Sequence, residues 1–259
     1  MELGHAALVA AGAFAAGGVN AVAGGGTFFS FPALLAAGLP PVTANASNTV
    51  ALWPASLSSA WAYRREALRH GRWAAILVGL SLLGGITGGL LLLATSNAAF
   101  ARLVPWLLLV ATALFAFSRQ IGGAVAAVKR RFGAAARQEP GSIGGALFQL
   151  AVAIYGGFFG AGMGILTLAA LSIQGLEDVQ ELNALKNLTS AVNYTVAAIV
   201  FIVAGAINWP FTLLMLVAAT IGGYVGAQFA RRLPAPWLRR LVVGMGTVLT
   251  ISYFAKNWS

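Results

Sequence analysis

The sequence contains no cysteine and very little charge. Without cysteine the chain forms no disulfide, holds no thiolate metal site and offers no cysteine nucleophile. Only 8% of its 259 residues are charged and 59% are hydrophobic, whereas a soluble domain carries about 25% charged residues. Because so few charges cannot cover a water-facing surface, we expect lipid to surround most of this chain.

Acidic residues and histidines are the scarcest ionisable groups, and they avoid the long apolar runs. All 6 acids and both histidines lie in connections, near segment ends or at the N-terminus: Glu2, His5, Glu66, His70, Glu139, Glu177, Asp178 and Glu181. Buried Asp, Glu or His residues are the usual parts of proton relays, metal sites and catalytic sites. We therefore expect no metal, no cofactor and no enzyme activity. A Ser–Lys pair involving Lys186 leaves an intramembrane enzyme as a minor alternative.

Long apolar segments make up most of the chain. They cover roughly residues 3–37, 47–63, 73–94, 103–118, 143–174, 184–204, 209–229 and 237–254. Crossing ~30 Å of hydrocarbon takes about 20 helical residues, and helices satisfy their own backbone groups in lipid. The sequence thus predicts an all-α integral membrane protein. Its net charge of +10 comes mainly from the connections, where lipid headgroups are the expected partner, so we exclude nucleic acid.

The sequence repeats itself at an offset of 138 residues without a gap. The matches hardest to obtain by chance are two glycine clusters and an Asn-Ala pair: Gly24 and Gly26 with Gly162 and Gly164, Asn45-Ala46 with Asn183-Ala184, and Gly84, Gly85 and Gly88 with Gly222, Gly223 and Gly226. We interpret the chain as two homologous four-segment halves, 1–125 and 140–259, joined by a basic linker, 126–139. Transporters often carry such duplications, with the binding site where the halves meet.

The first segment of each half, 3–37 or 143–174, is too long for one crossing and is broken by glycine. Either each is one long tilted helix, which gives parallel halves, or each bends back at its glycines, which gives inverted halves. Charge favours the second interpretation, because 13 of the 16 basic residues lie in 64–72, 119–142 and 230–240. Inverted halves put all three connections on one face, in keeping with the positive-inside tendency. We predict that this face is cytoplasmic and that both termini lie outside.

The glycine breaks are the first candidate binding elements. Half-helix N-termini carry partial positive charge and bind anions, and glycine lets the backbone approach an oxyanion closely. The candidate residues around the breaks are Asn20, Gly24, Gly25, Gly26, Thr27, Gly162, Met163 and Gly164. Tight packing of small residues between helices is the alternative role for these glycines.

Two segments that begin with asparagine supply the second set of candidates. Asn45 and Asn48 open one segment, and Asn183, Lys186 and Asn187 open its counterpart. Their amides donate hydrogen bonds without carrying charge. We also expect Asn45 and Asn183 to cap their helices. Lys186 either offers a positive charge to an anion or extends to the interface near Glu181.

These motifs stand in a recognisable order. A glycine-rich break at 17–27 precedes Phe31-Pro32, Gly38-Leu-Pro40 and the Asn45 segment, and the second half repeats the break and the asparagines. Over the whole chain this order resembles the sulfite exporter TauE/SafE family, also called TSUP. The second half departs slightly, with Met163 where the first half has Gly25 and no proline matching Pro32.

The resemblance implies a function in the bacterial inner membrane. It implies transport of small sulfur-containing or organic anions, such as sulfite, sulfonates or sulfoacetate. We expect a secondary transporter, because the chain has no GxxxxGK[ST] motif for ATP hydrolysis. H⁺ and Na⁺ are the candidate coupling ions, and a passive anion channel is the alternative function.

Overall fold

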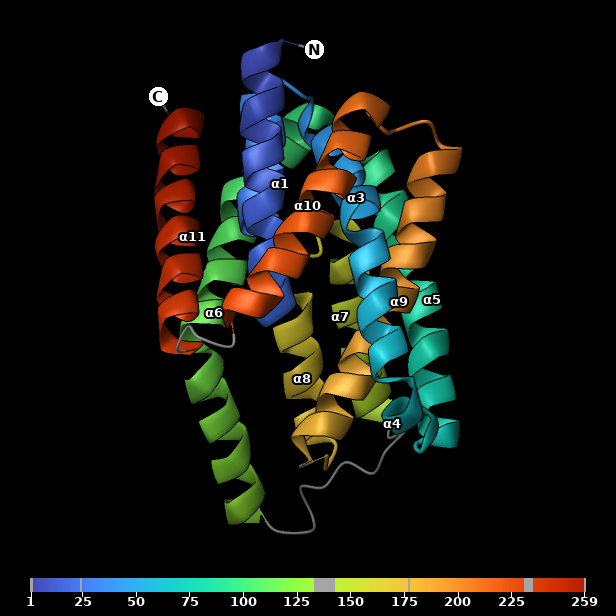
Figure 1. Cartoon of the computed structure of the whole chain (residues 1–259). Helices are drawn as coiled ribbons and strands as arrows, with labels where there is room; N and C mark the ends of the chain where they lie inside the picture. The colour runs from blue at the N-terminus through green and yellow to red at the C-terminus, as the bar shows by residue number, and fades with distance from the viewer. Residues whose placement is uncertain (1, 24, 133–142, 177, 231–234, 259) are drawn as a thin grey trace.

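The computed structural model describes residues 2–23, 25–132, 143–176, 178–230 and 235–258, which form helices that mostly stand alongside one another (Figure 1). In these ranges the helices are α1 (Leu3–Ala23), α2 (Thr27–Ala36), α3 (Pro41–Ala62), α4 (Arg64–Leu68), α5 (Gly71–Ala94), α6 (Asn97–Phe132), α7 (Ile143–Phe158), α8 (Met163–Ile173), α9 (Val179–Val203), α10 (Trp209–Ala230) and α11 (Ala235–Trp258). The predicted all-α fold is confirmed.

Several helices match the dimensions of a bilayer. Four described stretches are long and apolar enough to cross a membrane: Leu3–Asn20, Gly71–Ala94, Asn97–Phe117 and Gln180–Val203. Shorter apolar stretches accompany them in α2, α7, α8, α10 and α11. This is the pattern of a multi-pass membrane protein with some helices broken at membrane depth.

The chain folds back at both glycine breaks. A methyl group added at Gly12 in α1 would lie 2.7 Å from the Ala33 Cβ in α2. In the second half, a methyl group at Gly145 in α7 would lie 2.7 Å from the Gln174 side chain that follows α8. Each broken segment is therefore an antiparallel hairpin, and the interpretation of one long tilted helix is wrong.

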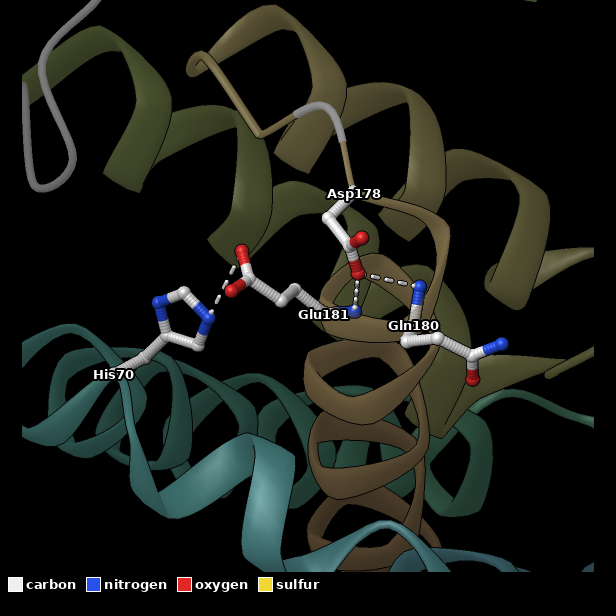
Figure 2. Close-up of polar contacts among 4 residues, drawn as sticks. All are labelled: His70, Asp178, Gln180 and Glu181. Carbon is white, nitrogen blue, oxygen red and sulfur yellow. Dashed lines mark hydrogen bonds and ion pairs between the residues drawn. The ribbon is translucent and has the colours of Figure 1, made fainter.

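The long helices of the two halves run in opposite directions. The Ser47 hydroxyl near the start of α3 accepts a 3.0 Å hydrogen bond from the amide of Asn208, which follows α9. Near the other end, the His70 imidazole before α5 lies 3.4 Å from the Glu181 carboxylate in the first turn of α9 (Figure 2). α3 and α9 are thus antiparallel, and both chain termini lie at the same end of the molecule (Figure 1).

Helix starts recur at the spacing of the predicted repeat. α3, α5 and α6 begin at residues 41, 71 and 97, and α9, α10 and α11 begin at 179, 209 and 235. Descent of the halves from one ancestor and the boundaries 1–125 and 140–259 stay predictions. The predicted linker 126–139 begins inside α6, which continues to Phe132, and residues 133–139 lie outside the described residues.

Each half packs its broken helix against the other half. α1 packs most extensively on α10, and α7 packs most extensively on α5. Glycines make both contacts close: a methyl group would lie 2.0 Å from the Ala219 carbonyl oxygen at Gly17, and 2.2 Å from the Ile154 carbonyl oxygen at Gly88. Small residues let membrane helices approach this closely. These two contacts hold the halves together and place both glycine breaks in the interior.

Candidate functional site

A polar cavity of about 120 Å³ lies between α1, α3, α9 and the second glycine break. Its described lining consists of Asn20, Leu52, Ser56, Ser59, Gly160, Met163, Gly164, Ile165, Leu168, Lys186, Asn187, Ser190 and Tyr194. Hydroxyl and amide groups come from α1, α3 and α9. Among these described lining residues, Lys186 carries the one charged side chain. The cavity therefore offers hydrogen bonds and a single positive charge.

Lys186 lies across the start of α8. A methyl group at Gly164 would lie 3.5 Å from the Lys186 Cδ, so the lysine stem packs over the first turn of α8. Amides of this turn already have local acceptors, as the Ile165 N–H donates to the Gly162 carbonyl, and the helix dipole makes this end of α8 positive. A lysine side chain and a helix N-terminus thus lie together at the cavity wall, and both favour an anion.

Glycine conformation produces the second break. Gly160 and Gly162 have φ values of +82° and +79°, in the left-handed region that side chains with a Cβ rarely adopt. The Tyr155 hydroxyl donates a 2.7 Å hydrogen bond to the Ala161 carbonyl and holds the turn between them. α7 therefore stops at Phe158 and α8 starts afresh at Met163.

The glycines of the first break have packing roles. A methyl group at Gly25 would lie 3.0 Å from the Phe115 ring, and one at Gly26 would lie 2.6 Å from the Ala16 carbonyl oxygen. Neither lines the polar cavity, and Gly24 lies outside the described residues. At the second break, a methyl group at Gly162 would lie 3.5 Å from the Ala111 Cα. Ala111 and Phe115 both belong to α6, so the two breaks contact α6 about one helical turn apart.

Asn48 and Thr27 form a buried polar cluster beside the cavity. Asn48 is 2% exposed and accepts a short hydrogen bond from the Ser30 hydroxyl. Its amide lies 3.5 Å from the Thr27 hydroxyl, which also interacts with the Tyr194 hydroxyl. Tyr194 lines the cavity and Asn48 does not. The cluster thus connects the start of α2 to the cavity wall.

The expectation that Asn45 and Asn183 cap their helices is wrong. α3 begins at Pro41, where the missing N–H of proline costs nothing, so Asn45 lies a full turn inside the helix. α9 is capped by Asp178, whose carboxylate accepts hydrogen bonds of 2.9 Å from the amides of Gln180 and Glu181 (Figure 2). Asn45 instead donates a 3.0 Å hydrogen bond to the Phe158 carbonyl at the end of α7. Asn183 is half-buried and does not line the cavity.

Of the residues chosen from the sequence, Asn20, Met163, Gly164, Lys186 and Asn187 line the cavity together. Sequence reasoning missed Ser56, Ser59, Gly160, Ser190 and Tyr194. Helical spacing could have found some of them, because Ser190 and Tyr194 follow Lys186 at intervals of four residues and share its helix face. Ser56 would follow as the residue that matches Tyr194 at the 138-residue offset.

The described residues hold no group of three or more His, Cys, Asp or Glu side chains suited to a metal ion. Broken helices, a polar cavity in the interior and apolar helices outside define a multi-pass membrane protein of the transporter type.

Comparison with known proteins agrees with this class. A family model described as sulfite exporter TauE/SafE matches residues 9–253, and the chain belongs to that family. A probable membrane transporter protein from Haemophilus influenzae is 26% identical over 247 residues, which cover 95% of this chain and 93% of that protein. The probable membrane transporter protein ORF9 of a Sinorhizobium species is 26% identical over 244 residues, covering 94% and 90%. YfcA of Escherichia coli K12, another probable membrane transporter protein, is 23% identical over 239 residues, covering 92% and 85%. No solved structure matches the chain. The bacterial relatives fit an inner-membrane location.

Proposed function

We propose that this protein is a secondary transporter that binds small sulfur-containing or organic anions in the Lys186 cavity and carries them across the inner membrane. The main observation behind this proposal is that Lys186 is the single charged residue in the described lining of a polar cavity and lies beside the N-terminus of α8. The names of the relatives support transport, and the family name supports a sulfur oxyanion.

The cavity provides hydrogen-bond donors that can replace the water molecules an anion loses when it enters the protein. Burying a bare charge is very costly, so the lost hydration must be replaced by donors of the protein. Lys186 supplies a charged donor, and Asn20, Asn187 and the cavity hydroxyls supply neutral ones. Charged hydrogen bonds are about twice as strong as neutral ones. Lys186 should therefore contribute more to anion affinity than any single amide.

Substitution of Lys186 tests the proposal. We expect Lys186→Met to weaken binding of a sulfonate by about one to two orders of magnitude, because it removes a charged hydrogen bond worth about 1.5–3 kcal/mol. Asn48→Ala should have a smaller effect, since Asn48 lies outside the cavity lining. Binding isotherms on purified protein, with folding checked by size-exclusion chromatography, give both affinities. An affinity within about twofold of the original in Lys186→Met would overturn the charged-site proposal.

Transport assays separate a carrier from a passive anion channel. A carrier in proteoliposomes shows saturable flux and countertransport, in which unlabelled substrate on one side drives labelled substrate uphill. A channel shows neither. Imposed gradients of H⁺ and of Na⁺ in the same vesicles identify the coupling ion.

A further inference from the structure

Three buried polar side chains lie where α5, α7 and α9 pack together, outside the described lining of the Lys186 cavity. Ser81 in α5, Gln149 in α7 and Thr189 in α9 are each at most 1% exposed. The Ser81 hydroxyl and the Gln149 side-chain oxygen have no hydrogen-bond partner among the described residues. Because a buried polar atom without a partner is costly, a bound ion or water molecule is expected between them.

Close contacts one helical turn away show where these three helices meet. A methyl group at Gly84 would lie 2.3 Å from the Ala153 Cβ, and one at Gly85 would lie 3.0 Å from the Asn193 carbonyl oxygen. The Asn193 amide also donates a 2.8 Å hydrogen bond to the Ala153 carbonyl. α5, α7 and α9 therefore all touch one another at this level.

The three helices run in the same direction. Four residues further along α5, a methyl group at Gly88 would lie 2.7 Å from the Phe158 amide nitrogen in α7. A methyl group at Gly89 would lie 3.4 Å from the Val200 side chain in α9. Since the contact residues advance together in all three helices, one turn back along each helix is again a common level.

Ser81, Gln149 and Thr189 occupy that level. Each precedes the contact residue of its own helix, Gly85, Ala153 or Asn193, by four positions. Residues four apart share a helix face, so the three side chains project into the same space between the helices. We call these three residues the polar trio.

Close packing of the helices does not require this polarity. At the 138-residue offset, alanines occupy all three equivalent positions, in α1, α3 and α10: Ala11, Ala51 and Ala219. The α1–α10 contact is at least as extensive as the α5–α7 contact. A ligand therefore explains the polar trio better than packing does.

The oxygens of the trio suit a small monovalent cation. The Gln149 amide oxygen only accepts hydrogen bonds, and the Thr189 hydroxyl already donates its proton over 2.9 Å to the Lys186 carbonyl, so both present lone pairs. Carboxylates usually help to hold a divalent cation, whereas neutral oxygens can replace the hydration shell of a monovalent one. The close approach of the helices at Gly84 and Gly85 leaves little room, which favours Na⁺ over the larger K⁺.

We propose that Ser81, Gln149 and Thr189 coordinate a Na⁺ ion that drives anion transport. The proposal rests on the proposed function and names its coupling ion. Thr189 follows Lys186 by three residues, about one turn of α9, so an anion that neutralises Lys186 also offsets the charge that repels the cation. Bound anion and bound Na⁺ therefore each raise the affinity for the other by the same factor.

The melting temperature of the purified, full-length protein measures Na⁺ binding without any sulfonate. At constant ionic strength, sodium gluconate should raise it above its value in potassium or choline gluconate. Ser81→Ala and Gln149→Leu each remove a ligand oxygen and should abolish this Na⁺-specific shift. Because each also removes an unpartnered buried polar atom, both variants should stay folded in choline. Ser58→Ala makes the matched change at an exposed position in α3 and should keep the shift.

Anion affinity tests the coupling. In the unsubstituted protein, replacing choline with Na⁺ should tighten methanesulfonate binding by about fivefold or more. Ser81→Ala should lose this effect and should bind methanesulfonate as the unsubstituted protein does in choline. Ser58→Ala should keep the effect.

The outcomes separate the Na⁺ site from the proposed function. A melting temperature no higher in sodium than in potassium or choline would show that the trio holds only water, and would overturn the site. A Na⁺-specific shift that persists in both Ser81→Ala and Gln149→Leu would overturn it as well. A shift that depends on the trio but leaves methanesulfonate affinity unchanged would overturn the coupling. Methanesulfonate binding that does not depend on Lys186 would overturn the proposed function and leave the Na⁺-specific shift in place.

Discussion

At the scale of single residues, glycines of one cluster serve different physical purposes. Gly162 has a positive φ of +79°, and the space around it is ordinary, with the nearest atom 3.5 Å from an added methyl group. Gly164, two residues later, is helical, and its nearest neighbour is the flexible Lys186 stem. The first glycine is needed for its backbone conformation, while the second gives Lys186 a place to lie.

This difference predicts that the same substitution destabilises the protein at one glycine and has little effect at the other. Gly162→Ala should lower the free energy of unfolding by about 1–2 kcal/mol, because a Cβ is strained in the left-handed region. Gly164→Ala should leave it within about 1 kcal/mol of the original value, since alanine favours the helix and the methyl group fits. Reversible unfolding in mixed-detergent micelles measures both. Equal losses in the two variants would contradict the assigned roles.

Chemical type made some site residues predictable and left others hidden. Lys186 is conspicuous because it is a cation at the start of an apolar segment, and Asn20 and Asn187 because they are amides in or beside one. Serines such as Ser56 and Ser59 occur along many membrane helices, where they bond to their own backbone, as Ser59 does to the Ala55 carbonyl. Only the packing of α3 against α9 turns them toward the cavity. Asn45 and Asn183 misled because an asparagine near a helix start resembles a cap.

At the scale of helices, the contacts of α1 with α10 and of α7 with α5 are the most extensive ones between the two halves. In α5, Gly84 and Gly88 lie one turn apart on the face toward α7, where added methyl groups would come within 2.3 Å of Ala153 and 2.2 Å of Ile154. Gly79 belongs to the same helix, yet an added methyl group there would meet nothing within 4 Å. The glycines of α5 therefore include both essential and dispensable positions.

Alanine substitution should separate these positions. Gly88→Ala should destabilise the protein by about 1–3 kcal/mol, because the methyl group overlaps backbone atoms that cannot move aside cheaply. Gly79→Ala is the matched control in α5 and should be neutral or stabilising by up to about 1 kcal/mol, as expected from helix propensity. The same unfolding assay applies. A Gly88→Ala protein as stable as Gly79→Ala would show that the α5–α7 contact is loose.

At the scale of the whole molecule, the direction of the chain was predictable from charge and its detailed packing was not. The three basic connections predicted the fold-back at both glycine breaks, and the contacts of Gly12 with Ala33 and of Gly145 with Gln174 confirm it. The exchange of partners, in which each half's broken helix packs on the other half, has no signal in a single sequence. The packing partner depends on which glycine-rich helix faces meet, and several helices of this chain have small residues that would allow such a close contact.

The same reasoning predicts the orientation of the protein in the membrane. Both termini lie at one end, and α4 and the end of α6 lie toward the other (Figure 1). Since the basic connections 64–72, 119–142 and 230–240 hold 13 of the 16 Lys and Arg residues, we expect them in the cytoplasm. The absence of cysteine from the chain makes single-cysteine probes clean reporters of this orientation.

Four probes, applied to intact cells with a membrane-impermeant maleimide, decide the orientation. Gly4→Cys, at an exposed position with no neighbour within 4 Å, should be labelled from outside. Arg65→Cys, Ala235→Cys and a probe inserted after Gln138 should be labelled only after the membrane is opened, because all three lie in or beside basic connections. Parallel halves would put Arg65 and Ala235 on opposite sides of the membrane. Protection of both probes in intact cells therefore distinguishes inverted halves from parallel ones. Labelling of Ala235→Cys from outside, with Arg65→Cys protected, would contradict the inverted arrangement.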